Sequence, residues 1–136
     1  MTERGSATLE LVLVTPVLLL MLLFVVFLGR LGEARNDVDR AARDAARAAS
    51  IARSADDADV AGRNAARSTL ESGGVSCRRL DVTVDASKFS VGGDVSATVT
   101  CTVDLADVAA LKVPGSETLT ASFTEPVDVY RGTVGP

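Results

Sequence analysis

The sequence has no histidine and no tryptophan, and it has only one tyrosine and four phenylalanines among 136 residues. The absence of histidine removes the commonest general base and a common metal ligand. There is also no glycine-rich phosphate loop, no HExxH pair and no Gly-x-Ser-x-Gly elbow. The sequence therefore predicts no enzyme, no catalytic residue and no cofactor.

Basic residues are outnumbered, with 14 Lys and Arg against 18 Asp and Glu and a formal net charge of −4. Nucleic-acid binding needs clustered Lys and Arg, and no basic stripe interleaved with aromatic residues occurs here. The acidic cluster Asp56-Asp57-x-Asp59 lacks the glycine and the distant glutamate of a calcium loop. We therefore expect neither a nucleic-acid partner nor a metal site.

A run without any charge extends from Leu11 to Gly29 and comprises 19 residues. As a helix it would be about 28 Å long, which is close to the hydrocarbon thickness of a bilayer. The alternative, a secretory signal peptide, would have a basic N-terminal region, a shorter apolar stretch and an Ala-x-Ala-like cleavage site. Because Gly29-Arg30-Leu31 follows the run instead, a transmembrane helix over residues 6–30 is favoured.

Residues 31–72 are predicted to form a soluble helical segment. The stretch from Leu31 to about Arg53 is rich in Ala and Arg and has no proline, so it should continue the membrane helix into water. Ser54 resembles an N-cap of a second, short helix that ends at Gly73-Gly74. A stripe of small apolar side chains suits close helix packing, although a solvated face with spare alanines is the alternative. The stripe comprises Val38, Ala41, Ala45, Ala48 and Ala52.

Residues 73–136 are predicted to form a small β-rich domain, because apolar and polar residues alternate there. Turn residues at Ser90-Val91-Gly92-Gly93 and a break at Pro114-Gly115 separate three strands. The fold class is therefore α+β, with an antiparallel sheet of about three strands whose apolar face is covered by helix. Its apolar positions are Leu80, Val82, Val84 and Ala86; Val95, Ala97, Val99, Cys101 and Val103; and Leu119, Ala121 and Phe123.

The two cysteines, Cys77 and Cys101, flank the first predicted hairpin. In an exported domain this arrangement favours a disulfide, and two free buried thiols are the alternative. Direct pairing of the cysteines across the strands would place Val84 opposite Asp94, so Cys77 should precede its strand unless the hairpin carries a bulge. A crosslink would stabilise a thin core by about 3 kcal/mol. The aromatic residues outside the run are Phe89, Phe123 and Tyr130.

The stretch Gly5-Ser6-Ala7-Thr8-Leu9-Glu10, followed by an apolar helix, resembles the class III signal of type IV pilin-like proteins. In that superfamily a prepilin peptidase cuts after the glycine, and glutamate is the fifth residue of the mature chain. The resemblance thus implies a leader over residues 1–5 and a processing site between Gly5 and Ser6. From Arg4 to Arg30 the sequence is similar to TadE-like proteins of the tight-adherence (Tad) pilus machinery. The downstream helix, the Cys-flanked hairpin and "TASFTEPVDVYRG" resemble actinobacterial members.

This resemblance implies a minor pseudopilin or pilus assembly factor of the Tad (Flp) pilus. Its partners would be the prepilin peptidase, other pilin or pseudopilin subunits, the inner-membrane assembly platform and membrane lipid. Glu10 would neutralise the Ser6 amine of a neighbouring subunit, or else would lie at the headgroup level with no such role. The alternatives are a single-pass anchored binding module without a pilus role and a type II secretion or competence pseudopilin.

The resemblance and the cysteines place the C-terminal domain outside the cytoplasm, with a single pass through the cell membrane. The distribution of arginine opposes this orientation under the positive-inside rule. Arg4 is the only basic residue before the run, and five arginines follow it closely: Arg30, Arg35, Arg40, Arg43 and Arg47. The processing motif is the more specific signal and decides the predicted orientation.

Overall fold

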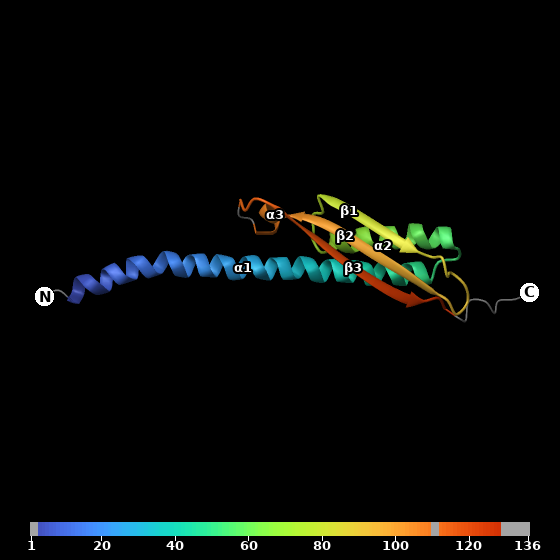
Figure 1. The fold of residues 1–136 in the computed structure, drawn as a ribbon, viewed down its shortest axis with the longest axis horizontal. Helices are drawn as coiled ribbons and strands as arrows, with labels where there is room; N and C mark the ends of the chain where they lie inside the picture. Colours follow the sequence, from blue (N-terminus) through green and yellow to red (C-terminus); the bar gives the residue numbers. More distant parts are fainter. Residues whose placement is uncertain (1–2, 110–111, 129–136) are drawn as a thin grey trace, which may run out of the picture.

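The structure is a computed structural model that describes residues 3–109 and 112–128. It begins with one uninterrupted helix, α1 (Glu3–Ser50), of 48 residues and about 72 Å. The N-terminal half of α1 projects alone, and every other element packs against its C-terminal half (Figure 1). Residues 1–2, which belong to the predicted leader, and the C-terminal residues 129–136, including Tyr130, lie outside the described residues.

A second helix, α2 (Ala55–Ser72), runs back alongside α1 and forms a helical hairpin with it (Figure 1). Ser54 caps this helix as expected, because its side chain accepts a hydrogen bond from the Asp57 N–H at 3.1 Å. The Gly73 N–H donates to the Thr69 carbonyl, and Gly74 then takes a positive φ of 74°. The first helix ends at Ser50, slightly before the predicted Arg53.

The three predicted strands are present as β1 (Arg79–Asp85), β2 (Asp94–Asp104) and β3 (Ser116–Pro126). They form one antiparallel sheet in the order β1-β2-β3. Leu80 lies opposite Cys101, so Cys77 precedes its strand and β1 pairs with β2 in continuous register. The α+β prediction is confirmed.

A short helix, α3 (Leu105–Ala109), links β2 to β3 and was not predicted from the sequence. With five residues it is too short to produce a helical repeat of apolar positions. A hydrogen bond joins the start of α3 to the residue before β3: the Leu105 N–H donates to the Gly115 carbonyl at 3.1 Å. Gly115 has a φ of 121°, a conformation that favours glycine.

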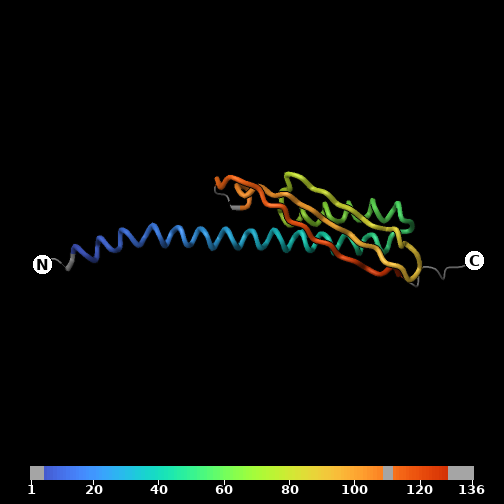
Figure 2. The backbone as a smooth tube through the Cα atoms, viewed as in Figure 1, coloured from blue at the N-terminus to red at the C-terminus, as the bar shows by residue number. Residues whose placement is uncertain are grey.

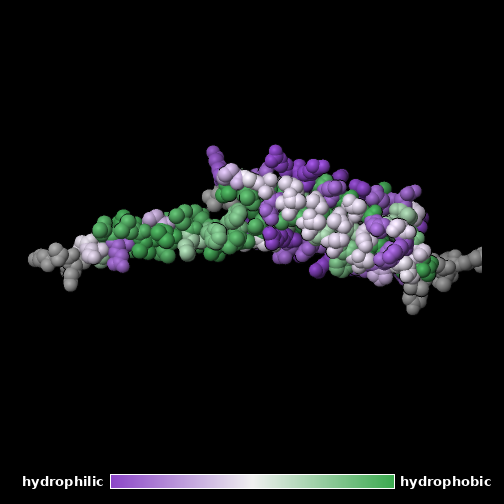
Figure 3. Space-filling view, in the orientation of Figure 1, coloured by the Kyte–Doolittle hydropathy of each residue, from purple (hydrophilic) through white to green (hydrophobic). Residues whose placement is uncertain are grey.

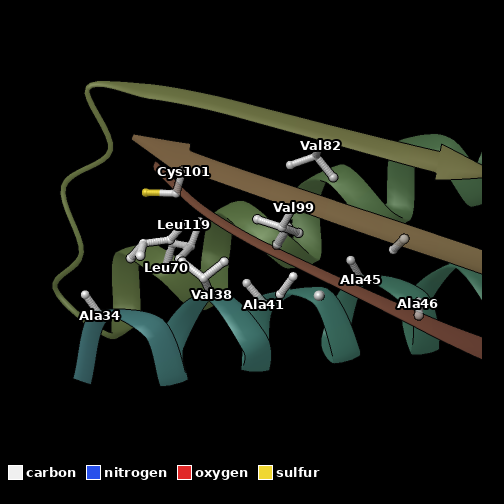
Figure 4. Close-up of a cluster of buried hydrophobic side chains, with 14 of the residues drawn as sticks. Ala34, Val38, Ala41, Ala45, Ala46, Leu70, Val82, Val99, Cys101 and Leu119 are labelled. Atoms are coloured by element: carbon white, nitrogen blue, oxygen red, sulfur yellow. The ribbon is translucent and has the colours of Figure 1, made fainter. Parts of the chain in front are cut away.

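The core lies between the sheet and the helical hairpin, and it is built mainly from small side chains (Figure 4). Val38, Ala41 and Ala45 of the predicted stripe are buried, but Ala48 and Ala52 are only half-buried. Other buried residues of α1 form a neighbouring row, because α2 and the sheet cover two sides of the helix. That row comprises Ala42, Ala46 and Ala49.

Close approach of the two helices depends on Gly62 in α2, which is buried. A Cβ at this position would lie 2.7 Å from Val84 Cγ2 and 3.3 Å from the Ala45 carbonyl oxygen. Two alanines of α2, Ala58 and Ala66, are also completely buried. Small residues therefore set the spacing of this interface.

The outer face of the sheet carries a ladder of hydroxyl pairs between β2 and β3. Directly opposite residues are hydrogen-bonded at 2.8–3.3 Å. Alternation places these side chains on the side opposite the core, where they contact water. The four pairs are Ser96–Thr124, Thr98–Ser122, Thr100–Thr120 and Thr102–Thr118.

Candidate functional site

The first candidate site is the projecting half of α1, which has large apolar side chains and no partner within the described chain. Leu11 and Leu20 are each 67% exposed. In the space-filling view this half forms an apolar rod, in contrast to the polar surface of the domain (Figure 3). Burial begins at Ala34, beyond the last residue of the uncharged run.

Within the described residues, one helix is long and apolar enough to cross a membrane, and it lies near the N-terminus. A signal sequence near the N-terminus meets the same criterion. The helix therefore indicates either a membrane anchor or a signal.

The predicted processing and association residues lie on the first turns of this helix. Gly5, Ser6 and Glu10 are all exposed, and no heavy atom lies within 4 Å of a Cβ built on Gly5. Ser6 and Glu10 are four positions apart, about 6 Å along the axis, and share one face. Within the described residues, no ion pair or hydrogen bond involves the Glu10 carboxylate.

Pro16 interrupts the hydrogen-bond ladder of the projecting half. It has no N–H, so the carbonyl of Val12 loses its ordinary intrahelical donor. One residue earlier, Thr15 Oγ1 donates to the Leu11 carbonyl at 2.6 Å. The N-terminal part of α1, which contains Pro16, is gently inclined to the rest of the helix (Figure 2).

The two cysteines are brought together at the other predicted site. Cys77 and Cys101 form a disulfide with a Cα–Cα separation of 5.4 Å. Cys101 is completely buried in the core beside Val99 and Leu119 (Figure 4), whereas Cys77 is half-buried in the segment between α2 and β1. The bond therefore ties the end of the helical hairpin to the central strand.

No group of three or more His, Cys, Asp or Glu side chains that could hold a metal occurs in the described part of the chain. In the acidic cluster, Asp59 instead forms an ion pair with Arg63 at 3.0 Å. Asp85 is the exposed last residue of β1, and hydrogen bonds from Ser87 lower the pKa of its carboxyl group.

Sequence reasoning missed a cleft at the end of the domain nearest the projecting helix. It lies between α1, the α2–β1 segment and α3, and has a volume of about 190 Å³. Its charged lining comprises Arg30, Glu33, Asp37 and Asp107. The unpredicted helix α3 supplies one wall, so no sequence pattern could have located the cleft.

These features define an α+β protein with an N-terminal apolar helix and a disulfide-linked domain. Residues 5–47 match the family model of TadE-like protein, a family of pilus components that are not known as enzymes. The match comprises the projecting helix and most of the packed half of α1. Searches of curated proteins and of solved structures found no match.

Proposed function

We propose that this chain is a membrane-anchored minor pseudopilin or pilus assembly factor of the Tad system. Residues 6–30 would anchor it, and residues 31–136 would lie outside the cytoplasm. The observation that carries the proposal is the sequence Gly5-Ser6 and Glu10 immediately before a bare apolar helix, inside the stretch that matches TadE-like protein. The likeness of the C-terminal part to actinobacterial members stays a prediction from the sequence.

The continuity of α1 favours an anchor over a signal peptide. Removal of the apolar run would require a cut near Gly29, within an unbroken helix that lacks an Ala-x-Ala-like site. The helix continues from there into the core, where Val38 is almost completely buried. The membrane segment and the domain would therefore stay on one polypeptide.

The disulfide supports an extracytoplasmic domain, because stable disulfides belong mainly to oxidising compartments. The arginines that follow the run favour the opposite orientation. The disulfide and the processing motif together carry more weight, since each depends on specific residues at specific positions. An anchored module without a pilus role would share this orientation but would not need Gly5 or Glu10.

Glu10 would link subunits through the new amine of Ser6. A carboxylate in the bilayer costs about 2.5–3.5 kcal/mol on insertion scales, and less near the surface, so it is expected to have a partner. Its own chain offers none among the described residues. Cleavage after Gly5 would create a cation one helical turn away on every subunit, available to the Glu10 of a neighbour.

Processing is tested by Gly5→Val. The added branched side chain should block the peptidase, so mass spectrometry of the membrane-extracted protein should find the uncut chain. Gly29→Val is the matched control, because it adds the same side chain in an open position at the far end of the run. It should be cut normally. A wild-type protein that begins at Met1 in a strain with the peptidase would contradict processing and favour the anchored binding module.

Association is tested by Glu10→Gln with a photo-crosslinking residue at Leu18, which is 62% exposed. The amide preserves the shape of the side chain but removes its charge, so cleavage and insertion should persist while crosslinks to other subunits decrease. Glu71→Gln makes the same change on the exposed surface of α2 and should leave the crosslinks unchanged. Unaltered crosslinks and pili in Glu10→Gln would assign Glu10 to the headgroup level alone.

A further inference from the structure

The cleft beside α3 lies where the bilayer surface would meet the domain. Arg30 directly follows the uncharged run, so the proposed anchor places its guanidinium at the headgroup level. The cleft opens beside it, between α1, the α2–β1 segment and α3. Helix α3 lies at the end of the domain that faces the projecting half of α1 (Figure 1). A ligand there would be in contact with the polar surface of the membrane.

The charged groups of the cleft are not neutralised by one another. Within the described residues, Arg30, Glu33, Asp37 and Asp107 take part in no ion pair or side-chain hydrogen bond. Three carboxylates and one guanidinium thus line a single cleft of about 190 Å³ without internal pairing. The lining offers partners for a positive and a negative group at once.

Asp37 is the innermost of these groups, and its surroundings favour a cation. It is half-buried, and a Cβ on Gly73 would lie 2.8 Å from its carboxylate. Gly73 caps the C-terminus of α2, where the helix dipole adds partial negative charge and the last turn has no basic residue. The site of Asp37 is therefore electronegative, and among the described residues no ion pair compensates its charge.

The charges follow a fixed order along α1. Glu33 lies about 4.5 Å and Asp37 about 10.5 Å beyond Arg30 along the helix axis. From the membrane outward, the protein thus presents apolar surface, a cation and then carboxylates. A phospholipid with an amine in its headgroup presents acyl chains, a phosphate anion and then an ammonium cation, which is the complementary order.

From this order and the unpaired lining, we infer that the cleft binds the headgroup of a phosphatidylethanolamine molecule. Arg30 binds the phosphate, and Asp37, with Glu33 and Asp107, accepts hydrogen bonds from the ammonium group. A choline headgroup carries the same charge but has no N–H to donate. A glycerol headgroup has no cation, and its net negative charge opposes the excess of carboxylates.

The inference depends on the proposed membrane anchor but not on any role in a pilus. The test embeds the full-length protein in nanodiscs with equal amounts of phosphatidylethanolamine, phosphatidylcholine and phosphatidylglycerol, and native mass spectrometry identifies the lipids retained on the released protein. We expect at least about fivefold enrichment of phosphatidylethanolamine over phosphatidylcholine, since charge-assisted hydrogen bonds are among the stronger ones.

Asp37→Asn should abolish this enrichment, because the amide keeps the shape of the side chain but loses the charge. Asp39→Asn is the matched control, since Asp39 is exposed on α1 and does not line the cleft. An unreduced disulfide and an unchanged circular dichroism spectrum would show that both variants are folded.

Equal retention of the ethanolamine and choline lipids by the wild type, or unchanged enrichment in Asp37→Asn, would overturn the inference. Neither result would contradict the proposed membrane anchor. Failure of the chain to enter nanodiscs would overturn the inference and the proposed anchor together. Unaltered crosslinks in Glu10→Gln together with persistent lipid selectivity would contradict the proposed role of Glu10 and leave the inference standing.

Discussion

The two halves of α1 reverse the usual relation between side-chain size and burial. The projecting half consists largely of Leu, Val and Phe, and Leu11 is 67% exposed. In the packed half, Ala41 and Ala45 are completely buried. Large apolar side chains exposed along a whole helix are costly in water but not in lipid. Under the proposed membrane anchor, one helix would serve two solvents.

The packed half also shows how such a small domain obtains close helix contacts. Alanine and glycine allow the backbones of α1 and α2 to approach, and the sheet then covers both helices. Each buried alanine removes little apolar area from water, so the core gains less per residue than a leucine core would. The domain should therefore depend strongly on its disulfide and on exact steric fit, whereas the projecting half should depend on neither.

The largest expected effect is the loss of the disulfide through the double change Cys77→Ala and Cys101→Ala. The crosslink closes a loop with a sequence separation of 24 residues, so its removal should lower the free energy of unfolding by about 3 kcal/mol. Urea unfolding of the full chain in detergent, followed by circular dichroism, measures this change. The helicity of the projecting half should persist.

Labelling with maleimide provides the check on the bond itself. If both thiols of the unreduced, denatured wild type react, the protein has no disulfide, and the contrast in stability between the two halves needs another source.

The next effect compares one substitution in the two environments, Gly62→Ala in the packed interface and Gly29→Ala in the projecting half. Alanine at residue 62 would crowd Val84 and the Ala45 carbonyl, and overpacking of this kind costs about 1–3 kcal/mol. The better helix propensity of alanine returns up to about 1 kcal/mol. The net loss of unfolding free energy should be about 1 kcal/mol for Gly62→Ala.

Gly29→Ala should not lower that free energy, because nothing lies within 4 Å of the added Cβ and alanine has the better helix propensity. The same urea titration measures both variants. Equal stability of the two variants would show that α1 and α2 adjust their spacing freely. The packed half of α1 would then be no more sensitive to an added methyl group than the projecting half.

The smallest effect on the free energy of unfolding is expected for a substitution on the outer face of the sheet, which is exposed to water. Thr98→Val removes one hydroxyl of the pair with Ser122, whose oxygen atoms are 3.0 Å apart. Water can replace the lost partner and valine suits a strand, so the free energy of unfolding should change by less than about 0.5 kcal/mol. A loss above about 1 kcal/mol would indicate that the four hydroxyl pairs act cooperatively.

Much of the fold follows from local patterns in the sequence. The N-cap at Ser54, the glycines that end α2 and the alternation in β1, β2 and β3 each depend on neighbouring residues, and all appear as predicted. The position of Cys77 before its strand also followed from strand register. These features are local because side-chain periodicity and capping involve only a few adjacent residues.

Features that depend on contacts between distant segments could not be predicted. Ala48 was predicted to belong to the packed stripe of α1, but it is only half-buried. The periodicity of a helix does not encode the direction from which α2 and the sheet cover it. The cleft combines Asp37, Gly73 and Asp107 from three separate elements. Only Arg30 carried a signal, as the first charge after the apolar run.

The uninterrupted course of α1 has a mechanical consequence. The helix shows no break between the projecting half and the core (Figure 2). Ala34, about one turn beyond Arg30, is already buried. Between Pro16 and Ser50 the helix contains no proline, so this part of α1 has no hinge about which the domain could swing. Any rotation or tilt of the proposed membrane segment would be transmitted along α1 to the far end of the domain. The orientation of the anchor in the bilayer would then set the orientation of the whole exposed surface.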